Sequence, residues 1–409
     1  MQLPSFHELT LGCDPEIFVS YEVGKVRKRR VVVGSEAILP PNDPKRTAAR
    51  LVRDGVQVEL HPDYSWCRAN LSNSIQACFR QLDVAVKRAS RARQLDLKVD
   101  FRSVVRLSKG DLAKMSPETR QLGCQPSKNV YGRKHIQKDG TKYLIRSAAG
   151  HIHLGSEALT KGKIDHEKLI KIMDVLVGNT AVMIDRDPLA SERRKVYGRA
   201  GEWRPQPHGI EYRTLSNFWL HNYRLMSLVT GLAKTAFKVS HAGQEFPVHY
   251  GTWNKNWFTN AEQFLMGDVD LRLIEQAINT NDFELARSNY ERWVKPFFKQ
   301  VTNNDDGLAA DKLEDFDHFV NKIRQAELDG NEQPLNVWFP EDPLAHWMGK
   351  KEGHGRGWES WLQDVVMSDR LLNGTISGVI AIPSTKEVKA MPFDNFDAPI
   401  VGAHIIGGM

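Results

Sequence analysis

Short runs of alternating apolar and polar residues dominate the first quarter of the chain. Residues 17–23 (IFVSYEV) and 29–34 (RRVVVG) predict two strands that pair in the manner of a hairpin. Residues 56–61 (VQVELH) repeat with a period of two and predict a third strand, and another is expected over about 99–106. These runs predict an antiparallel sheet with one apolar face.

Apolar residues recur at helical spacing in three longer segments. Helices are predicted over about 70–94, 164–184 and 216–240, and helical patterns rich in Asn, Asp and Trp follow beyond residue 250. The mixture predicts an α+β fold: an antiparallel β-sheet with helices packed on one face, followed by a helical C-terminal extension.

Composition narrows the class of protein. With 409 residues, of which 41% are apolar and 26% charged, the chain has the make-up of a globular protein with a sizeable core. The net charge of +6 suits an anionic substrate, but solubility alone explains it equally well, and no zinc-finger, RNP or basic-zipper pattern indicates nucleic acid. Four scattered cysteines predict reduced thiols, and the most apolar stretch, 169–184, carries Lys171 and Asp174 and predicts a buried helix rather than a membrane span. We therefore expect a cytoplasmic protein.

Four predicted strands place charged or imidazole side chains on one face and apolar side chains on the other. Residues two apart on a strand share a face, so the following sets project together. They are Asp14 with Glu16; Gln57 with Glu59 and His61; His151 with His153; and Glu211 with Arg213.

Taken singly, each set is equally consistent with an ordinary solvated face, and the histidine pair alone is compatible with a metal site, a phosphate contact or a hydrogen-bonded pair. Together they carry four carboxylates, which repel one another unless cations bind between them. Carboxylates with an imidazole suit Mg²⁺ or Mn²⁺, which nucleotide phosphates share. We interpret His61 as a hydrogen-bonding residue at the strand end rather than a ligand.

An arginine-rich loop is predicted between the histidine strand and the Glu211 strand. It contains Arg193, Arg194, Arg199 and Arg204. Guanidinium groups bind phosphate in a bidentate manner, so a mobile loop of this kind beside bound cations favours phosphoryl transfer, although a solvent-facing charged connection is the alternative. No Walker or kinase glycine-rich motif is present in the sequence, so ATP would bind through metals and arginines.

Five short motifs in this order resemble the phage-type COOH-NH2 ligase type 2 family of amidoligases, within the glutamine synthetase/glutamate–cysteine ligase superfamily. They are GCDPEIFV, DGVQVELHP, GHIHLG, YGRAGEWR and GIEYRTLSNFW, and they cover about residues 8–225. The resemblance implies a glutamine synthetase-like sheet that holds ATP with two or three Mg²⁺ or Mn²⁺ ions. It also implies an ATP-dependent ligase that joins a carboxylate to an amine through an acyl phosphate, with 1–250 as the catalytic domain and 251–409 as the extension.

The resemblance also implies a role for each matching residue. Metal ligands would be Asp14, Glu16, Glu59, His151 and Glu211. His153 and Arg213 would contact ATP. From the arginine-rich loop we add Arg194 and Arg204 as further ATP-phosphate contacts, and we expect Arg213, Arg204 and Arg194 to act in catalysis. Asp14 stands where glutamate is common in glutamine synthetases, which would make its metal contact water-mediated. The missing match to an ammonium pocket favours an amine larger than ammonia.

Two other classes of function stay open at this stage. An H-x-H pair on a strand also occurs in amidohydrolase-like zinc hydrolases, although those sites need further His or Asp ligands. A non-catalytic phage structural or nucleic-acid-binding protein on a ligase-like fold is the second alternative, because fold alone does not establish activity. The expected partners are a small-molecule or peptide carboxylate and an amine, in the host cytoplasm if a phage encodes the chain, and a homo-oligomer is left open.

Overall fold

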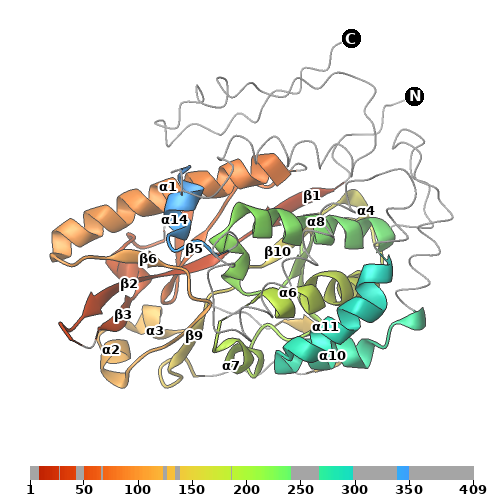
Figure 1. Ribbon diagram of the computed structural model, residues 1–409. Coiled ribbons are helices and arrows are strands. Elements are labelled where there is room, and N and C mark those ends of the chain that lie inside the picture. The colour runs from red at the N-terminus through yellow and green to blue at the C-terminus, as the bar shows by residue number, and fades with distance from the viewer. Residues whose placement is uncertain are drawn as a thin grey trace, which may run out of the picture.

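The computed structural model describes residues 9–26, 28–42, 50–65, 68–122, 127–133, 139–185, 187–240, 267–297 and 339–349. Within them, strands and helices mix as an α+β fold, and every strand pairing is antiparallel (Figure 1). None of the helices in these ranges combines the length and the apolar character that a membrane span needs. The predicted loop at 349–357 beyond Gly349, the tail from 376, Cys67 and Cys124 lie outside the described residues.

The strands form two five-stranded sheets, where the sequence predicts one. The first sheet has the order β1 (Thr10–Cys13), β10 (Ile152–Gly155), β12 (Gly209–Tyr212), β11 (Glu202–Gln206) and β8 (Lys128–Asn129). The second has the order β3 (Arg29–Val33), β2 (Glu16–Val23), β5 (Gln57–Leu60) and β4 (Leu51–Asp54), with β6 (Lys98–Asp100) also paired to β2. The predicted hairpin is therefore confirmed as β2 and β3, and the two sheets are joined through the short link between β1 and β2.

The predicted strand over 99–106 is broken into β6 and β7 (Val104–Arg106), which pairs with β9 (Ile145–Ser147) in a small separate sheet. The break has a clear cause. The backbone N–H groups of Ser103 and Val104 both donate to Asp187 Oδ2 at 2.8 Å, which turns the chain out of the first pairing.

All three predicted long helices form, with two irregularities. The helix over 70–94 is α1 (Arg68–Arg93), and the helix over 164–184 is α5 (His166–Met173), the π-helical segment η2 (Asp174–Gly178) and α6 (Asn179–Ile184). The helix over 216–240 begins as a 3₁₀ turn, η3 (Asn217–His221), and continues as α8 (Tyr223–Ser240). The shorter helices are α2 (Lys109–Ala113), α3 (Pro117–Arg120), α4 (Glu157–Thr160), α7 (Ala190–Arg194), α10 (Leu271–Thr280), α11 (Phe283–Asn289), the π-helical η5 (Tyr290–Val294) and α14 (Pro343–Trp347).

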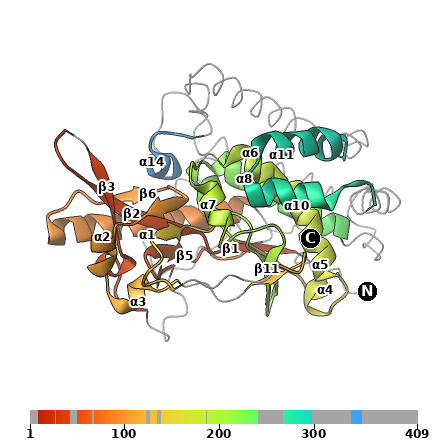
Figure 2. The same cartoon turned by 90° about the horizontal axis from the view of Figure 1, so that it is seen from below.

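One large apolar cluster joins the helices to the first sheet. Ile152, Leu154 and Ile210 are fully buried and pack in the same cluster as residues of α1, α5 and α8. The cluster also includes Ile278 of α10 and Trp347 of α14, so the described C-terminal helices share this core (Figure 2). The apolar face of β10 and β12 is thereby fixed, and the opposite face is left for polar side chains.

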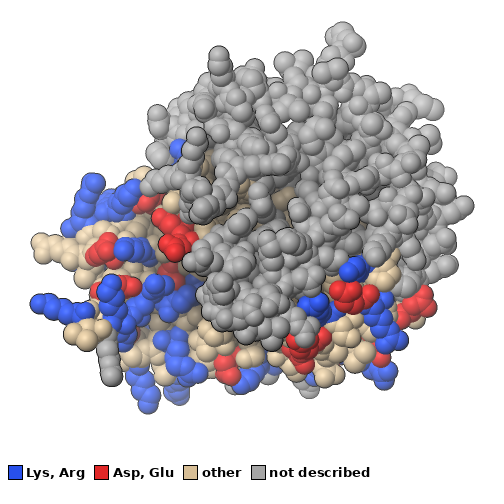
Figure 3. Space-filling view, viewed as in Figure 1, with Lys and Arg blue, Asp and Glu red and all other residues tan. Residues whose placement is uncertain are grey.

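The described residues of the basic run, 25, 26 and 28–30, lie at the β2–β3 end of the molecule, where Lys and Arg gather with Asp and Glu between them (Figure 3). Lys28 pairs with Glu22 at 3.1 Å, and Arg29 pairs with Asp111 at 2.8 Å. Local ion pairs therefore offset much of this run, in keeping with the solubility interpretation.

Candidate active site

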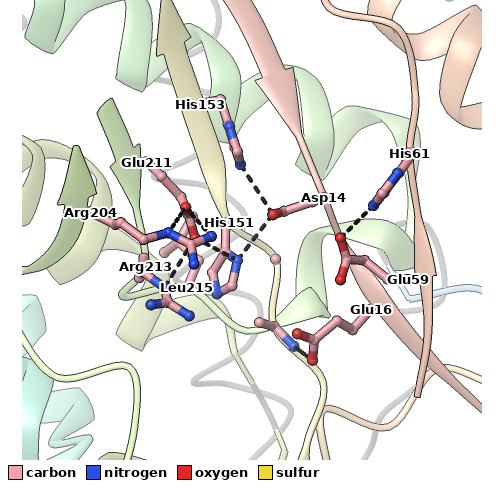
Figure 4. Close-up of polar contacts among 12 residues, drawn as sticks. Asp14, Glu16, Glu59, His61, His151, His153, Arg204, Glu211, Arg213 and Leu215 are labelled. Atoms are coloured by element: carbon pink, nitrogen blue, oxygen red, sulfur yellow. Dashed lines mark hydrogen bonds and ion pairs between the residues drawn. The ribbon is translucent and has the colours of Figure 1, made fainter. Parts of the chain in front are cut away.

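The predicted site residues gather where the two sheets meet. Strand β1 ends at Cys13 and β2 begins at Glu16, so Asp14 and Pro15 form the link between the sheets. The Glu16 N–H donates to the carbonyl of Ala149 at 2.8 Å, which holds the start of β2 beside the segment that leads into β10. Figure 4 shows Asp14 between His151 and His153 on one side and Glu59 on the other.

The register of the first sheet aligns the predicted side chains. His153 lies opposite Gly12 on one neighbouring strand and opposite Glu211 on the other, and Glu211 in turn lies opposite Arg204. Both histidines contact Asp14: His151 Nδ1 lies 3.0 Å from Oδ1, and His153 Nε2 lies 3.2 Å from Oδ2. The predicted common face of the histidine pair is therefore confirmed.

Three of the five predicted metal ligands converge in one group. Ligand atoms of Asp14, His151 and Glu211 all lie within 4.8 Å of one another, and His151 Nδ1 is 3.3 Å from Glu211 Oε1. Glu211 is fully buried, and among the described residues its Oε1 makes ion pairs but no hydrogen bond of good geometry. Two carboxylate oxygens and an imidazole nitrogen are a donor set that accepts Mn²⁺ or Mg²⁺, so the residues fit a divalent cation.

Charge pairing controls the protonation of this group. Burial disfavours the ionised carboxylate of Asp14 and by itself would raise its pKa. The charges and hydrogen bonds of the two histidines together have the larger effect and hold the pKa of Asp14 well below its usual range. Burial likewise disfavours protonated His153, yet the charge and hydrogen bond of Asp14 raise its pKa. His153 also lies 3.2 Å from His208, whose ring stacks on it with centroids 5.3 Å apart. Asp14 is therefore ionised at neutral pH.

Two predicted arginines flank Glu211. Arg204 Nη2 lies 2.6 Å from Glu211 Oε2, and Arg213 Nε lies 3.0 Å from Oε1. Arg213 is buried, whereas 28% of the Arg204 side chain is exposed. The strands thus hold two guanidinium groups beside the three-residue group, and Arg204 has a side that reaches solvent.

Arg194 has a different position from the one predicted. Its guanidinium is buried and donates to the carbonyls of Gly198 and Thr214, and burial lowers its pKa to about 10. Arg193 is buried in the same way and donates to the carbonyls of Thr214 and Leu215 at 2.8 and 2.6 Å. The segment expected to be a mobile arginine loop is instead α7 and β11 joined by a turn that hydrogen bonds hold in place, and Arg194 supports this turn. Its contact with phosphate stays a prediction.

Glu16 and Glu59 belong to a second carboxylate group, which also includes Asp54. Glu16 Oε2 accepts from the Ala149 N–H at 2.9 Å and from Gln57 at 3.3 Å, and Glu59 Oε1 lies 2.6 Å from His61 Nε2. Burial and the neighbouring carboxylates Asp54, Glu59 and Asp14 raise the pKa of Glu16 well above its usual range. Burial, with Asp14 and Asp54, also raises the pKa of Glu59 to about 7.

This second group brings three carboxyl groups, those of Glu16, Asp54 and Glu59, close to one histidine, His61. His61 bonds Glu59, as predicted for a hydrogen-bonding residue at the end of the strand. The sequence analysis did not single out Asp54, because it stands at the end of β4, before the turn at Gly55, outside the predicted strand.

Sequence reasoning also missed Tyr197, Glu202 and Gln206. Glu202 and Gln206 share the Arg204 face of β11, and Gln206 donates to Glu211 Oε2. The alternation of GEWRPQ is a usable strand signal, but its proline and the arginine-rich surroundings favour a loop. Tyr197 opens the motif YGRAGEWR, but no alternation there indicates its role, because its place depends on a turn in the chain.

Comparison with known families gives one match. Residues 138–311 match the family described as phage phiEco32-like COOH.NH2 ligase-type 2. The matched segment contains His151, His153, Arg204, Glu211 and Arg213, and confirms the resemblance seen in the motifs. It supports a carboxylate–amine ligase enzyme with a carboxylate and an amine as substrates. Asp14, Glu16 and Glu59 lie before the matched segment. A search of curated proteins finds no match to the chain.

Proposed function

Because residues 138–311 match a family of carboxylate–amine ligases, we propose that this chain uses ATP to activate a carboxylate and joins it to an amine. One observation carries the proposal: Asp14 directly after β1, His151 directly before β10 and Glu211 on β12 converge, with Arg204 and Arg213 beside them. Divalent-cation ligands beside arginines are the arrangement that binding and cleaving a nucleoside triphosphate needs. The antiparallel sheet that carries them supports a glutamine synthetase-like fold.

Asp14, His151 and Glu211 would hold one Mg²⁺ or Mn²⁺ ion, and Glu16 and Glu59 with Asp54 would hold another. A bound divalent cation neutralises the charge of the ATP phosphates. The pKa values of Glu16 and Glu59 are raised by burial and, to a smaller extent, by repulsion among the neighbouring carboxylates, and a cation bound between these groups would relieve that repulsion. Deprotonation of Glu59 near its pKa of about 7 would strengthen that binding as the pH rises.

The reaction would proceed in two steps. An oxygen of the substrate carboxylate attacks the γ-phosphorus of ATP, and the bond between the γ-phosphorus and the oxygen that bridges it to the β-phosphate breaks. ADP then departs, and the substrate has become an acyl phosphate. The lone pair of the amine then attacks the acyl carbon, the bond to the phosphate oxygen breaks, and inorganic phosphate leaves as the amine loses a proton. Arg204 and Arg213 would stabilise negative charge on the transferred phosphoryl group, and His153 would contact the ATP phosphates.

The test measures ADP release with Mg²⁺ and pools of carboxylic acids and amines, together with Mg-ATP binding by calorimetry. The absence of both ADP release and Mg-ATP binding with every pool would overturn the proposal. A zinc hydrolase would instead depend on Zn²⁺ and be indifferent to ATP. Mass spectrometry of the products from active pools identifies the amide that forms.

Asp14→Asn provides a specific prediction for this site. The substitution keeps the shape of the side chain but removes the anion that two histidines face, so we expect ADP release to fall at least 100-fold with the fold retained. Asp96→Asn is the control, because the Asp96 side chain is 82% exposed and pairs with Lys98 at the surface. Equal activity of the two variants would contradict the assignment of Asp14 as a ligand.

A further inference from the structure

We propose that Tyr197 is a positioning residue that holds His151 and Arg213 in register and sets which nitrogen of His151 faces the metal. The proposal rests on the proposed function and deepens it. Tyr197 follows α7 in a turn, is 5% exposed, and is not among the residues that the sequence motifs assigned a role. Its hydroxyl lies between His151 Nε2 and Arg213 Nη2, with 2.9 Å to the latter.

The hydrogen-bond chemistry of the three groups gives the hydroxyl a definite task. Arg213 can only donate, so the Tyr197 oxygen accepts from it. When Nε2 of His151 also donates to this oxygen, the lone pair of Nδ1 is directed to the side where Asp14 Oδ1 and Glu211 Oε1 lie, 3.0 and 3.3 Å away. This tautomer is the one that can bind a cation through Nδ1. Without a cation, Nδ1 donates to the ionised Asp14 carboxylate and the Tyr197 hydroxyl donates to Nε2. When a cation takes Nδ1, the proton moves to Nε2 and the same hydroxyl oxygen accepts it, which a phenylalanine ring cannot do, so Tyr197 supports the metal-binding form.

The ring of Tyr197 makes further contacts with the same partners. The guanidinium carbons of Arg193 and Arg213 lie 5.1 and 5.2 Å from the ring centroid, within the range of cation–π attraction. The ring also meets His151 edge-on, at 5.8 Å between centroids. Tyr197 therefore contacts both a proposed metal ligand and a proposed phosphate-binding arginine.

The turn that carries Tyr197 is tied to the strand segment that carries Arg213. Arg193 and Arg194 donate to the carbonyls of Thr214 and Leu215, directly after Arg213. On the other side of the turn, the Gly198 N–H donates to Glu202 Oε2 at 3.0 Å. These bonds fix the phenol relative to β12, as expected for a group whose task is to orient others.

Tyr197→Phe removes only the hydroxyl and tests the proposal directly. In nucleotide-free protein, we expect Mn²⁺ affinity measured by calorimetry to fall about 10–100-fold, which is the usual effect of losing a partner of a metal ligand. We also expect KM for ATP to rise, because Arg213 loses its fixed position. Tyr21→Phe is the matched control, since Tyr21 lies on β2 and has no contact with this site in the described residues.

A double-mutant cycle separates positioning from a general loss of structure. If Tyr197 acts through His151, Tyr197→Phe lowers Mn²⁺ affinity in the unsubstituted chain and has no further effect in a His151→Asn background. An equal loss in both backgrounds, or unchanged Mn²⁺ affinity in Tyr197→Phe, would overturn this inference while the proposed function stands. No Mn²⁺ binding and no ADP release by the unsubstituted chain would overturn both.

Discussion

At the scale of single residues, period-two alternation identified most of the site. The side chains of His151 and His153 share a face because Ile152 and Leu154 are fully buried on the other, and Glu211 and Arg213 follow the same rule. Arg194 and Tyr197 could not be placed in this way, because their positions depend on tertiary hydrogen bonds: Arg194 donates to the Thr214 carbonyl, and the Tyr197 hydroxyl accepts from Arg213. A motif therefore indicates which residue types are present, while tertiary contacts decide which of them face the ligand.

The space around Gly198 is also set by a tertiary contact, and this contact leads to a prediction. Its φ is +69°, and a methyl group there would lie 1.9 Å from Nη1 of the buried Arg193. Gly198→Ala therefore combines backbone strain with displacement of a guanidinium, and we expect it to lower the free energy of unfolding by about 3 kcal/mol. Gly132→Ala is the control, because φ is +72° with nothing within 4 Å, and we expect about 1 kcal/mol. Urea unfolding measures both, and equal losses would show that Arg193 does not restrict this turn.

At the scale of elements, the helix predicted over 164–184 forms as one continuous helix. It takes the wider π-helical form at η2, where it contacts Tyr212 of β12. Tyr212, between Glu211 and Arg213 on β12, donates to Asp174 Oδ1 at 2.7 Å. A side chain at Gly178 would lie 2.6 Å from the Tyr212 hydroxyl. Helical periodicity predicts the helix, but the contact that demands the wider turn comes from a residue 38 positions away, which a local pattern cannot show.

Asp174 makes this contact sensitive to pH. Burial raises the pKa of Asp174 to about 7, against the opposing hydrogen bonds from Tyr212 and Tyr131. Between about pH 4 and pH 7, the Asp174 carboxyl is protonated in the folded state but ionised in the unfolded state. Its contribution to the free energy of unfolding is therefore fully present below about pH 4 and is lost as the pH rises to about 7.

We expect Asp174→Asn to remove this loss, because the amide keeps an acceptor for Tyr212 and has no proton to release. Its stability relative to the unsubstituted chain should improve by a few kcal/mol between about pH 4 and pH 8, since one pKa unit corresponds to about 1.4 kcal/mol. Urea unfolding at several pH values measures the difference. Asp268→Asn, at an exposed position, serves as the control and should show no such trend.

At the scale of the whole molecule, the sequence predicts the fold class but not the number of sheets. Alternation indicates antiparallel strands without showing that pairing changes at Asp14 and Pro15, because this depends on which distant strands are neighbours. The change has a functional consequence, since it brings two carboxylate groups to one junction. The domain boundary near residue 250 stays a prediction. The described C-terminal helices pack in the same apolar cluster as the residues before this boundary.

Trp347 of α14 links the C-terminal part to the N-terminal core. It is fully buried, its Nε1 donates to the Leu220 carbonyl at 2.6 Å, and its ring lies 5.4 Å from that of Phe79 on α1 (Figure 1). Gln76 of α1 donates to the Trp347 carbonyl at 2.6 Å. Trp347 is 271 positions from Gln76 and 127 positions from Leu220 in sequence, so these contacts join distant parts of the chain.

We expect Trp347→Ala to lower the free energy of unfolding by about 3–5 kcal/mol, the usual cost of removing a buried aromatic side chain. Because its partners lie in the core of 1–250, the whole chain should still unfold in one transition, with the same midpoint by fluorescence and by circular dichroism. Val26→Ala, at a side chain that is 96% exposed, should leave the midpoint unchanged. Two transitions, of which Trp347→Ala moves only one, would instead show that the C-terminal part folds as a unit of its own and that the boundary near 250 divides independent domains.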